Sequence, residues 1–189
     1  MVDGLIVSIA EPAVPNMQLA QKVYRYEIRA KEGSSSSNMI TELKESILAD
    51  IVEDEMAPFY LTLCKKFEWA EDESFVSPLT ERNADTLAKL DSNRTEAKEN
   101  AGETEVLDAM FAKARYLMRI GNQPLAFVAY DEIAAMEKTS SVKKIDALLE
   151  KTRLALFLMD RAAIKECIQA AEAKVESGGD WDRCSTYIV

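Results

Sequence analysis

The chain has 189 residues, the length of one domain, and its 48% apolar and 30% charged residues are typical of a globular protein rather than a disordered one. Its 23 basic and 33 acidic side chains give a net charge of −10, which disfavours contact with nucleic acid or an anionic membrane surface. Histidine is absent, so the commonest general base, metal ligand and pH switch is excluded.

The N-terminal part of the sequence predicts two short helices joined by a polar loop. The first sixteen residues contain prolines and no helical period, which predicts a leader without regular structure. Asn16 has the side chain of a helix cap, and apolar residues spaced by three and four predict a helix from there to about Lys31. The serine-rich stretch 33–38 predicts a flexible loop, after which an apolar stripe predicts a helix over 39–54.

Two prolines divide the next stretch. Pro58 disfavours helix at the residue before it and fits the first turn of a helix over about 59–69. The acidic segment 71–74 and Pro78 together predict a connector. Residues 79–100 keep a helical pattern but are mostly polar, which predicts a solvated spacer helix.

The strongest pattern lies in the C-terminal half, where apolar residues recur every three or four positions in four consecutive segments. Gly121 and Asn122 follow the first of these segments, where a helix should end, and Pro124 stands where the next should begin. Laying 117–130 over 156–169 aligns helix-turn-helix features at an offset of 39 residues. That offset lies between the tetratricopeptide period of about 34 and the HEAT or armadillo period of about 40–47.

The sequence therefore predicts an all-α fold of stacked helical hairpins, a TPR-like right-handed solenoid arm preceded by N-terminal helices. Each hairpin buries one face, the next hairpin covers the other, and such arrays bind proteins through a groove or through their ends. The residues expected to face the core in the last three helices are Leu125, Val128, Ala129 and Ile133; Val142, Ile145, Leu149, Thr152, Leu156 and Met159; and Ile164, Cys167, Ile168, Ala171 and Val175.

Side chains that could carry catalysis or hold a metal are scarce. Cys64 and Cys167 lie in apolar surroundings and are expected to be packed thiols, while nothing beside Cys184 would activate it. The acidic runs 53–55 and 71–73 lack the alternating spacing of a calcium loop, so we interpret them as a solvated helix end and a solvated loop. The sequence thus predicts no enzyme, catalytic residue, cofactor, metal site or small-molecule substrate, although a carboxylate pair assembled by the fold stays open.

Cellular location is inferred from the cysteines and from hydropathy. Three widely spaced cysteines argue against a disulfide framework and favour reduced thiols, as in the cytoplasm and nucleus. The longest strongly apolar run, 154–159, is far below the ~20 residues of a membrane span. We therefore expect a cytoplasmic and nuclear protein without membrane contact.

A short polar and aromatic string, Gly-Gly-Asp-Trp-Asp-Arg at 178–183, follows the last predicted helix. Two interpretations are open. In one, Asp180 caps a further helix and Trp181 is a wedge between adjacent hairpins. In the other, the string touches another protein, and on that interpretation Asp180, Trp181 and Arg183 are the candidate partner contact.

Several of these stretches together resemble a known family. The run 54–64, in which Met-Ala-Pro precedes two aromatic residues, and the string 178–183 resemble the N-terminal region of PCI-family lid subunits of the 26S proteasome. The resemblance extends over about 15–183. It implies a helical-repeat arm followed by a winged-helix PCI module, in a scaffold subunit that is not itself catalytic. It also implies contacts with other lid subunits and a role in ubiquitin-dependent protein degradation.

Two features depart from that family. The PCI module is missing and 184–189 do not resemble the family's next helix, so the chain is expected to be truncated or alternatively ended. The expected layout is a leader, short helix and serine-rich loop over 1–38, helices with a polar spacer over 39–101, a TPR-like repeat domain over 102–183 and a divergent tail over 184–189. A scaffold like the first subunit of the COP9 signalosome and an independent helical-repeat adaptor stay open as alternatives.

Overall fold

The computed structural model describes residues 14–32 and 37–176, and every regular element in these two stretches is an α-helix. No strand occurs among them, which confirms the prediction of an all-α stack of helical hairpins. The helices in chain order are α1 (Met17–Glu32), α2 (Ser37–Glu53), α3 (Ala57–Phe67), α4 (Glu73–Asn100), α5 (Glu103–Arg119), α6 (Gln123–Ala135), α7 (Ser141–Phe157) and α8 (Arg161–Glu176).

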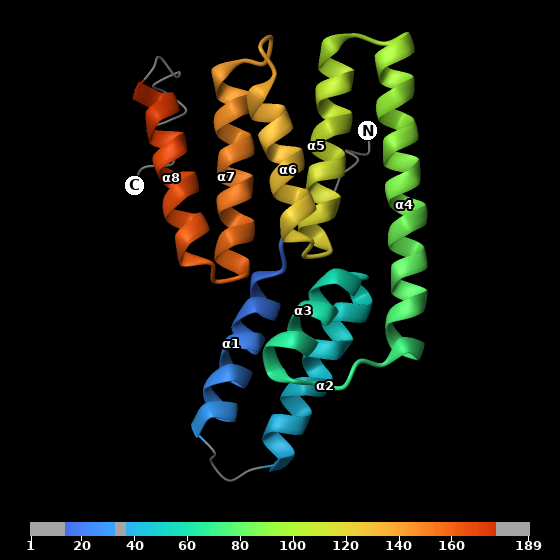
Figure 1. Ribbon diagram of the computed structural model, residues 1–189, viewed down its shortest axis with the longest axis vertical. Coiled ribbons are helices and arrows are strands. Elements are labelled where there is room, and N and C mark those ends of the chain that lie inside the picture. Colours follow the sequence, from blue (N-terminus) through green and yellow to red (C-terminus); the bar gives the residue numbers. More distant parts are fainter. Residues whose placement is uncertain (1–13, 33–36, 177–189) are drawn as a thin grey trace, which may run out of the picture.

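The helices form two parts (Figure 1). α1, α2 and α3 make an N-terminal unit at one end of the molecule, and α4 to α8 stand side by side as a row of antiparallel helices. Each helix of the row packs against the one before it, and α5 also touches α7. α4, with 28 residues, begins beside the N-terminal unit and runs along the outer edge of the row to the end of the molecule opposite that unit, so it contacts both parts.

Polar side chains begin five of the helices, as local capping chemistry requires. In each case a side-chain oxygen accepts the backbone N–H three residues further on: Asn16 at 3.2 Å, Asp72 at 3.2 Å, Asn122 at 3.3 Å, Ser140 at 3.4 Å and Asp160 at 3.1 Å. The predicted cap at Asn16 is confirmed.

Asp160 caps α8 and also ties two helix starts together. Its Oδ1 accepts the backbone N–H of Ala163, and its Oδ2 accepts from Nε2 of Gln123 at 3.0 Å, at the first residue of α6. The N–H of Ala163, followed by the Gln123 amide, holds the pKa of Asp160 below its ordinary value because both bonds favour the charged carboxylate.

The connector predicted from 71–74 and Pro78 is only partly right: residues 71–72 lie between helices, but α4 begins at Glu73 and contains Pro78. Pro78 lacks the N–H that would bond to the carbonyl four residues earlier, so the helix loses one hydrogen bond near its start. Apolar packing offsets this loss. The Phe75 ring lies 4.8 Å from the ring of Tyr60, and Val76 and Leu79 are buried. The rest of α4 is mostly exposed, as predicted.

The predicted inner face of α6 is also partly wrong. Leu125 and Val128 are 51% and 56% exposed, while Ala126, Tyr130 and Ile133 are buried. α6 packs against both α5 and α7, and the row that faces these neighbours is the one that carries the small Ala126. Periodicity identifies a helix with two adjacent apolar rows, but it does not reveal which row the neighbours cover.

The same shift occurs in the last hairpin. Among the residues expected to face the core there, the structure buries Ile145, Thr152, Cys167 and Ala171 but exposes Leu156, Met159 and Ile168. The structure instead buries Leu154, Ala155 and Phe157 at the end of α7.

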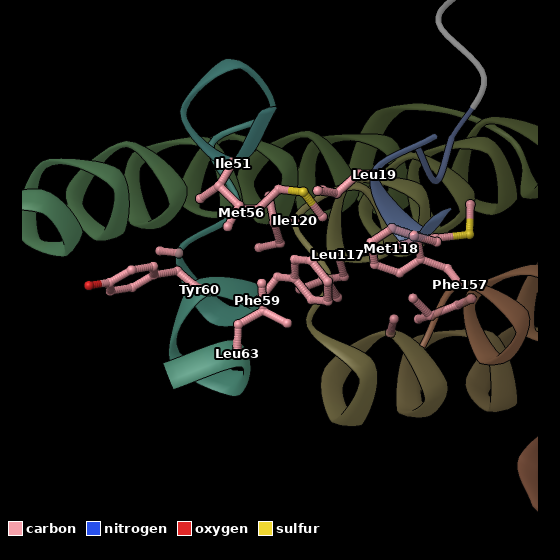
Figure 2. Close-up of a cluster of buried hydrophobic side chains, with 14 of the residues drawn as sticks. Leu19, Ile51, Met56, Phe59, Tyr60, Leu63, Leu117, Met118, Ile120 and Phe157 are labelled. Atoms are coloured by element: carbon pink, nitrogen blue, oxygen red, sulfur yellow. The ribbon is translucent and has the colours of Figure 1, made fainter. Parts of the chain in front are cut away.

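One apolar core joins the N-terminal unit to the row of helices (Figure 2). Its side chains come from α1 to α7 and the turns between them, and the buried members labelled in Figure 2 are Leu19, Ile51, Met56, Phe59, Tyr60, Leu63, Leu117, Met118, Ile120 and Phe157. Phe59 of α3 is central, because its ring lies 4.8 Å from the ring of Phe157 at the end of α7. Burial of these side chains at about 25 cal/mol per Å² of apolar surface holds the two parts in one orientation.

Gly121 in the turn between α5 and α6 lies directly against Phe59. Its φ of 71° is in the left-handed region, as expected where a helix ends in glycine. A Cβ at this position would lie 2.8 Å from Cβ of Phe59, which is closer than two carbon atoms can approach. Backbone conformation and close packing therefore both require glycine here.

We predict that Gly121→Ala destabilises the chain by at least about 2 kcal/mol, because alanine is strained at positive φ and its Cβ collides with Phe59. Urea unfolding followed by circular dichroism measures the change. Gly102→Ala is the matched control, since its φ is −89° and the new Cβ meets only the flexible end of Glu105. Equal stability of the two variants would contradict the prediction.

We predict that Asp160→Ala costs about 1 kcal/mol near neutral pH, through loss of the α8 cap. A carboxylate with a depressed pKa contributes stability above its unfolded pKa and loses it as the pH falls through its folded pKa. The difference in free energy of unfolding between the parent chain and Asp160→Ala should therefore become smaller below about pH 4. Asp160→Asn keeps an acceptor, and thermal unfolding should show a smaller loss for it at neutral pH. A stability difference that grows on acidification would refute the assignment of Asp160 as a charged cap of α8.

Candidate functional site

The partner contact expected from the sequence lies outside the described residues. Asp180, Trp181 and Arg183 all follow Glu176, where the described part of the chain ends. This contact stays a prediction.

No group of three or more Cys, Asp or Glu side chains that could hold a metal ion occurs within the described ranges. Cys64 and Cys167 are buried and unpaired, which confirms them as packed thiols. Burial raises the pKa of Cys167 because it disfavours the thiolate. None of the described helices has both the length and the apolar content that a bilayer span requires.

The acidic run at 53–55 is not simply a solvated helix end. Asp54 accepts a hydrogen bond from Asn16 at 3.3 Å and pairs with Arg119 at 3.4 Å. Glu55 pairs with Arg82 at 2.8 Å, and its carbonyl accepts from the buried side chain of Asn83 at 2.8 Å. The ion pairs of Asp54 with Arg119 and of Glu55 with Arg82 thus connect the N-terminal unit to α5 and α4.

One concave surface in the described part of the chain is a groove between α4 and α6, with α5 as its floor. Its volume is about 390 Å³, at the small end of the range for ligand pockets. Most of its lining is apolar, and those residues are Leu87 of α4, Met110 and Leu117 of α5, and Leu125, Val128 and Ala129 of α6. The groove is thus lined by three of the four α6 side chains that the sequence pattern assigned to the core, Leu125, Val128 and Ala129.

Two ion pairs lie along this groove. Arg94 Nη1 of α4 meets Glu132 of α6 at 3.2 Å and so crosses the groove, while Lys113 Nζ of α5 meets Asp91 of α4 at 2.5 Å. The side chains of both cations are only 26% exposed, whereas those of Asp91 and Glu132 are 53% and 49% exposed. The cations therefore lie deeper than their partners.

The guanidinium of Arg94 is incompletely satisfied. Its Nε–H is buried and has no hydrogen-bond acceptor among the described residues. An apolar floor with recessed cations can bind another molecule by burial and ionic contact. Sequence reasoning missed this surface, and the signal that could have found it was the second apolar row of α6.

The family model for 26S proteasome subunit RPN7 matches residues 72–189. The chain belongs to the RPN7 family. It is 31% identical over 171 residues to 26S proteasome non-ATPase regulatory subunit 6 of Dictyostelium discoideum, covering 90% of this chain and 42% of that protein. The resemblance to the PCI-family lid subunits is thereby confirmed.

Other members of the RPN7 family agree. The Arabidopsis thaliana homolog of regulatory subunit 6 is 35% identical over 144 residues, 75% of this chain and 36% of that protein. Regulatory subunit RPN7 of Saccharomyces cerevisiae is 27% identical over 195 residues, 92% of this chain and 44% of that protein. The chain thus spans about two fifths of the length of these relatives. The match to a proteasomal family favours this assignment over the COP9 signalosome alternative.

We predict that iodoacetamide modifies Cys64 and Cys167 at least tenfold more slowly in the native chain than in the chain unfolded in guanidinium chloride, because both thiols are buried. Site-resolved mass spectrometry of timed samples at neutral pH measures both rates. Rapid labelling of Cys167 under native conditions would contradict its place in the core between α7 and α8.

Proposed function

We propose that this chain is a non-catalytic scaffold subunit of the lid of the 26S proteasome regulatory particle, and that it acts in ubiquitin-dependent protein degradation through protein–protein contacts. The single observation that carries the proposal is membership of the RPN7 family, because the relatives' names describe regulatory subunits of that particle. On this proposal the partners are other lid subunits, and the chain works in the cytoplasm and nucleus without a cofactor, nucleic acid, membrane or small-molecule substrate.

The fold supports a mechanical role. A row of antiparallel helices with capped starts and a shared core presents fixed surfaces, and stacked hairpins of this kind serve as docking platforms. The proposed repeat domain over 102–183 contains α5 to α8, and the proposed unit over 39–101 contains α2, α3 and the long α4. The chain would then act by holding neighbouring subunits at defined positions, with apolar area for affinity and charged edges for orientation.

We predict that affinity purification of the tagged full chain from cells enriches lid subunits at least tenfold over a tag-only control, as quantified by mass spectrometry. The matched control is Gly121→Ala, in which the junction between the two parts is disturbed; it should recover less lid at equal expression. Enrichment of COP9 signalosome subunits instead would favour that alternative. Enrichment of unrelated proteins alone would favour an independent adaptor, and either result would refute the proposal.

A further inference from the structure

We propose that the exposed face of α8 binds a second copy of this chain, so that two α8 helices lie antiparallel across a twofold axis near Ile168. α8 stands at the edge of the row of helices, where it packs against α7 (Figure 1). The inference goes beyond the proposed function and does not depend on it, because the side chains of α8 alone carry it.

One row of α8 carries basic residues in its first half and acidic residues in its second half. Positions spaced by four, three, four and four residues lie on one face of a helix. In α8 five exposed residues have this spacing, and they are, in order, Arg161, Lys165, Ile168, Glu172 and Glu176. None of the four charged side chains has an ion-pair partner within the described residues.

This order of charges does not stabilise α8 itself. Like charges four residues apart repel each other on a helix, as in Arg161 with Lys165 and Glu172 with Glu176. The helix dipole favours acidic groups near the N-terminus and basic groups near the C-terminus, and this row has the opposite order. Contact with another molecule therefore gives the arrangement a physical reason that the helix alone does not.

The row is complementary to its own reverse. In an antiparallel pair of α8 helices centred between residues 168 and 169, Arg161 of one copy lies opposite Glu176 of the other, and Lys165 lies opposite Glu172. A twofold axis makes each of these two ion pairs twice, with the two Ile168 side chains at the centre. A parallel pair would instead place like charges together. The charges thus favour a second copy of this chain in the antiparallel orientation.

Helix dimensions allow the inner and outer ion pairs to form together. At 1.5 Å per residue, Lys165 and Glu172 lie about 5 Å from the axis along the helix, and Arg161 and Glu176 lie about 11 Å from it. Two helices that cross at about 20° diverge by about 4 Å at the outer pairs. The long side chains of arginine and glutamate can span that divergence.

Apolar side chains beside the charged row supply area that the ion pairs enclose. Ile168 is 44% exposed at the centre, and Ile164 and Val175 on either side of it are half-buried. Because surface ion pairs contribute little by themselves, we expect this apolar stripe to supply most of the affinity and the charges to select the orientation. One helix pair makes a small interface, so the expected dissociation constant is on the order of 10–100 μM.

Sedimentation equilibrium of the purified full chain, over concentrations that span this dissociation constant, tests the inference. We expect a reversible equilibrium between monomer and dimer. Raising the salt concentration should shift it toward the monomer, because screening weakens exposed ion pairs.

Charge reversal tests the register of the two helices. Lys165→Glu places two carboxylates at each inner contact, and Glu172→Lys places two ammonium groups there. Each single variant should raise the dissociation constant at least tenfold, because attraction becomes repulsion at both inner contacts. The double variant restores opposite charges and should return the constant to within fivefold of the parent. An equimolar mixture of the two single variants should form a heterodimer for the same reason.

The matched controls are Lys89→Glu and Glu96→Lys. These residues have the same types and the same seven-residue spacing, and they are exposed on α4 at the opposite edge of the row. They change the net charge equally and should leave the dissociation constant within twofold of the parent. Circular dichroism melts confirm that each variant is folded, which exposed positions permit.

Four outcomes would overturn the inference. The chain could stay monomeric over the whole concentration range, or the dimer could persist in both single variants of α8. The α4 controls could weaken the dimer as much as the α8 variants do, or the two single variants could fail to form a heterodimer. Co-purification of lid subunits tests the proposed function separately, so either assignment can fail while the other stands.

Discussion

The contact of Phe59 with the turn at Gly121 sets the geometry on which the other surfaces depend. Phe59 belongs to α3, Gly121 ends α5, and the Phe157 ring that completes the contact belongs to the last turn of α7. The absence of a Cβ at Gly121 lets backbone and ring meet directly. Since α6 begins two residues after that turn, the contact also fixes where the wall of the groove that carries Leu125 and Val128 starts.

Hydrogen bonds and ion pairs fix the relative positions of helices that the apolar core holds together. The Asn83 amide donates to the carbonyl of Glu55 and lies 3.0 Å from Oη of Tyr116, so it links α4 both to the turn before α3 and to α5. Farther along the row, the buried Tyr130 donates to Glu150 at 2.9 Å, and Arg115 contacts the same carboxylate through two nitrogens. Directional bonds of this kind set the register of neighbouring helices, which apolar packing alone leaves loosely defined.

The helices and most of their ends were predictable because they depend on local chemistry. The side chains of Asn16 and Asn122 cap the starts of α1 and α6, and Gly121 adopts the positive φ that suits glycine after a helix. Pro78 was misjudged because its local preference is outweighed by packing of distant aromatic and aliphatic neighbours. The second apolar row of α6 marks one wall of the groove in the sequence, but the groove itself depends on how far α4 stands from α6 across α5, which no local pattern encodes. The family resemblance was visible in motifs, but those at 178–183 lie beyond the described residues.

Because α4 is long, a small change of its tilt at the N-terminal unit displaces its other end by several ångströms. Twenty-eight residues at 1.5 Å each give a helix of about 42 Å, so a tilt of about 5° at its start would carry its far end about 4 Å sideways. Arg94 lies in the last two turns of α4, so such a displacement would change its contact with Glu132. A small change in how α1, α2 and α3 pack against the start of α4 would therefore change the width of the groove between α4 and α6. The shape of the groove thus depends on the packing at the opposite end of α4.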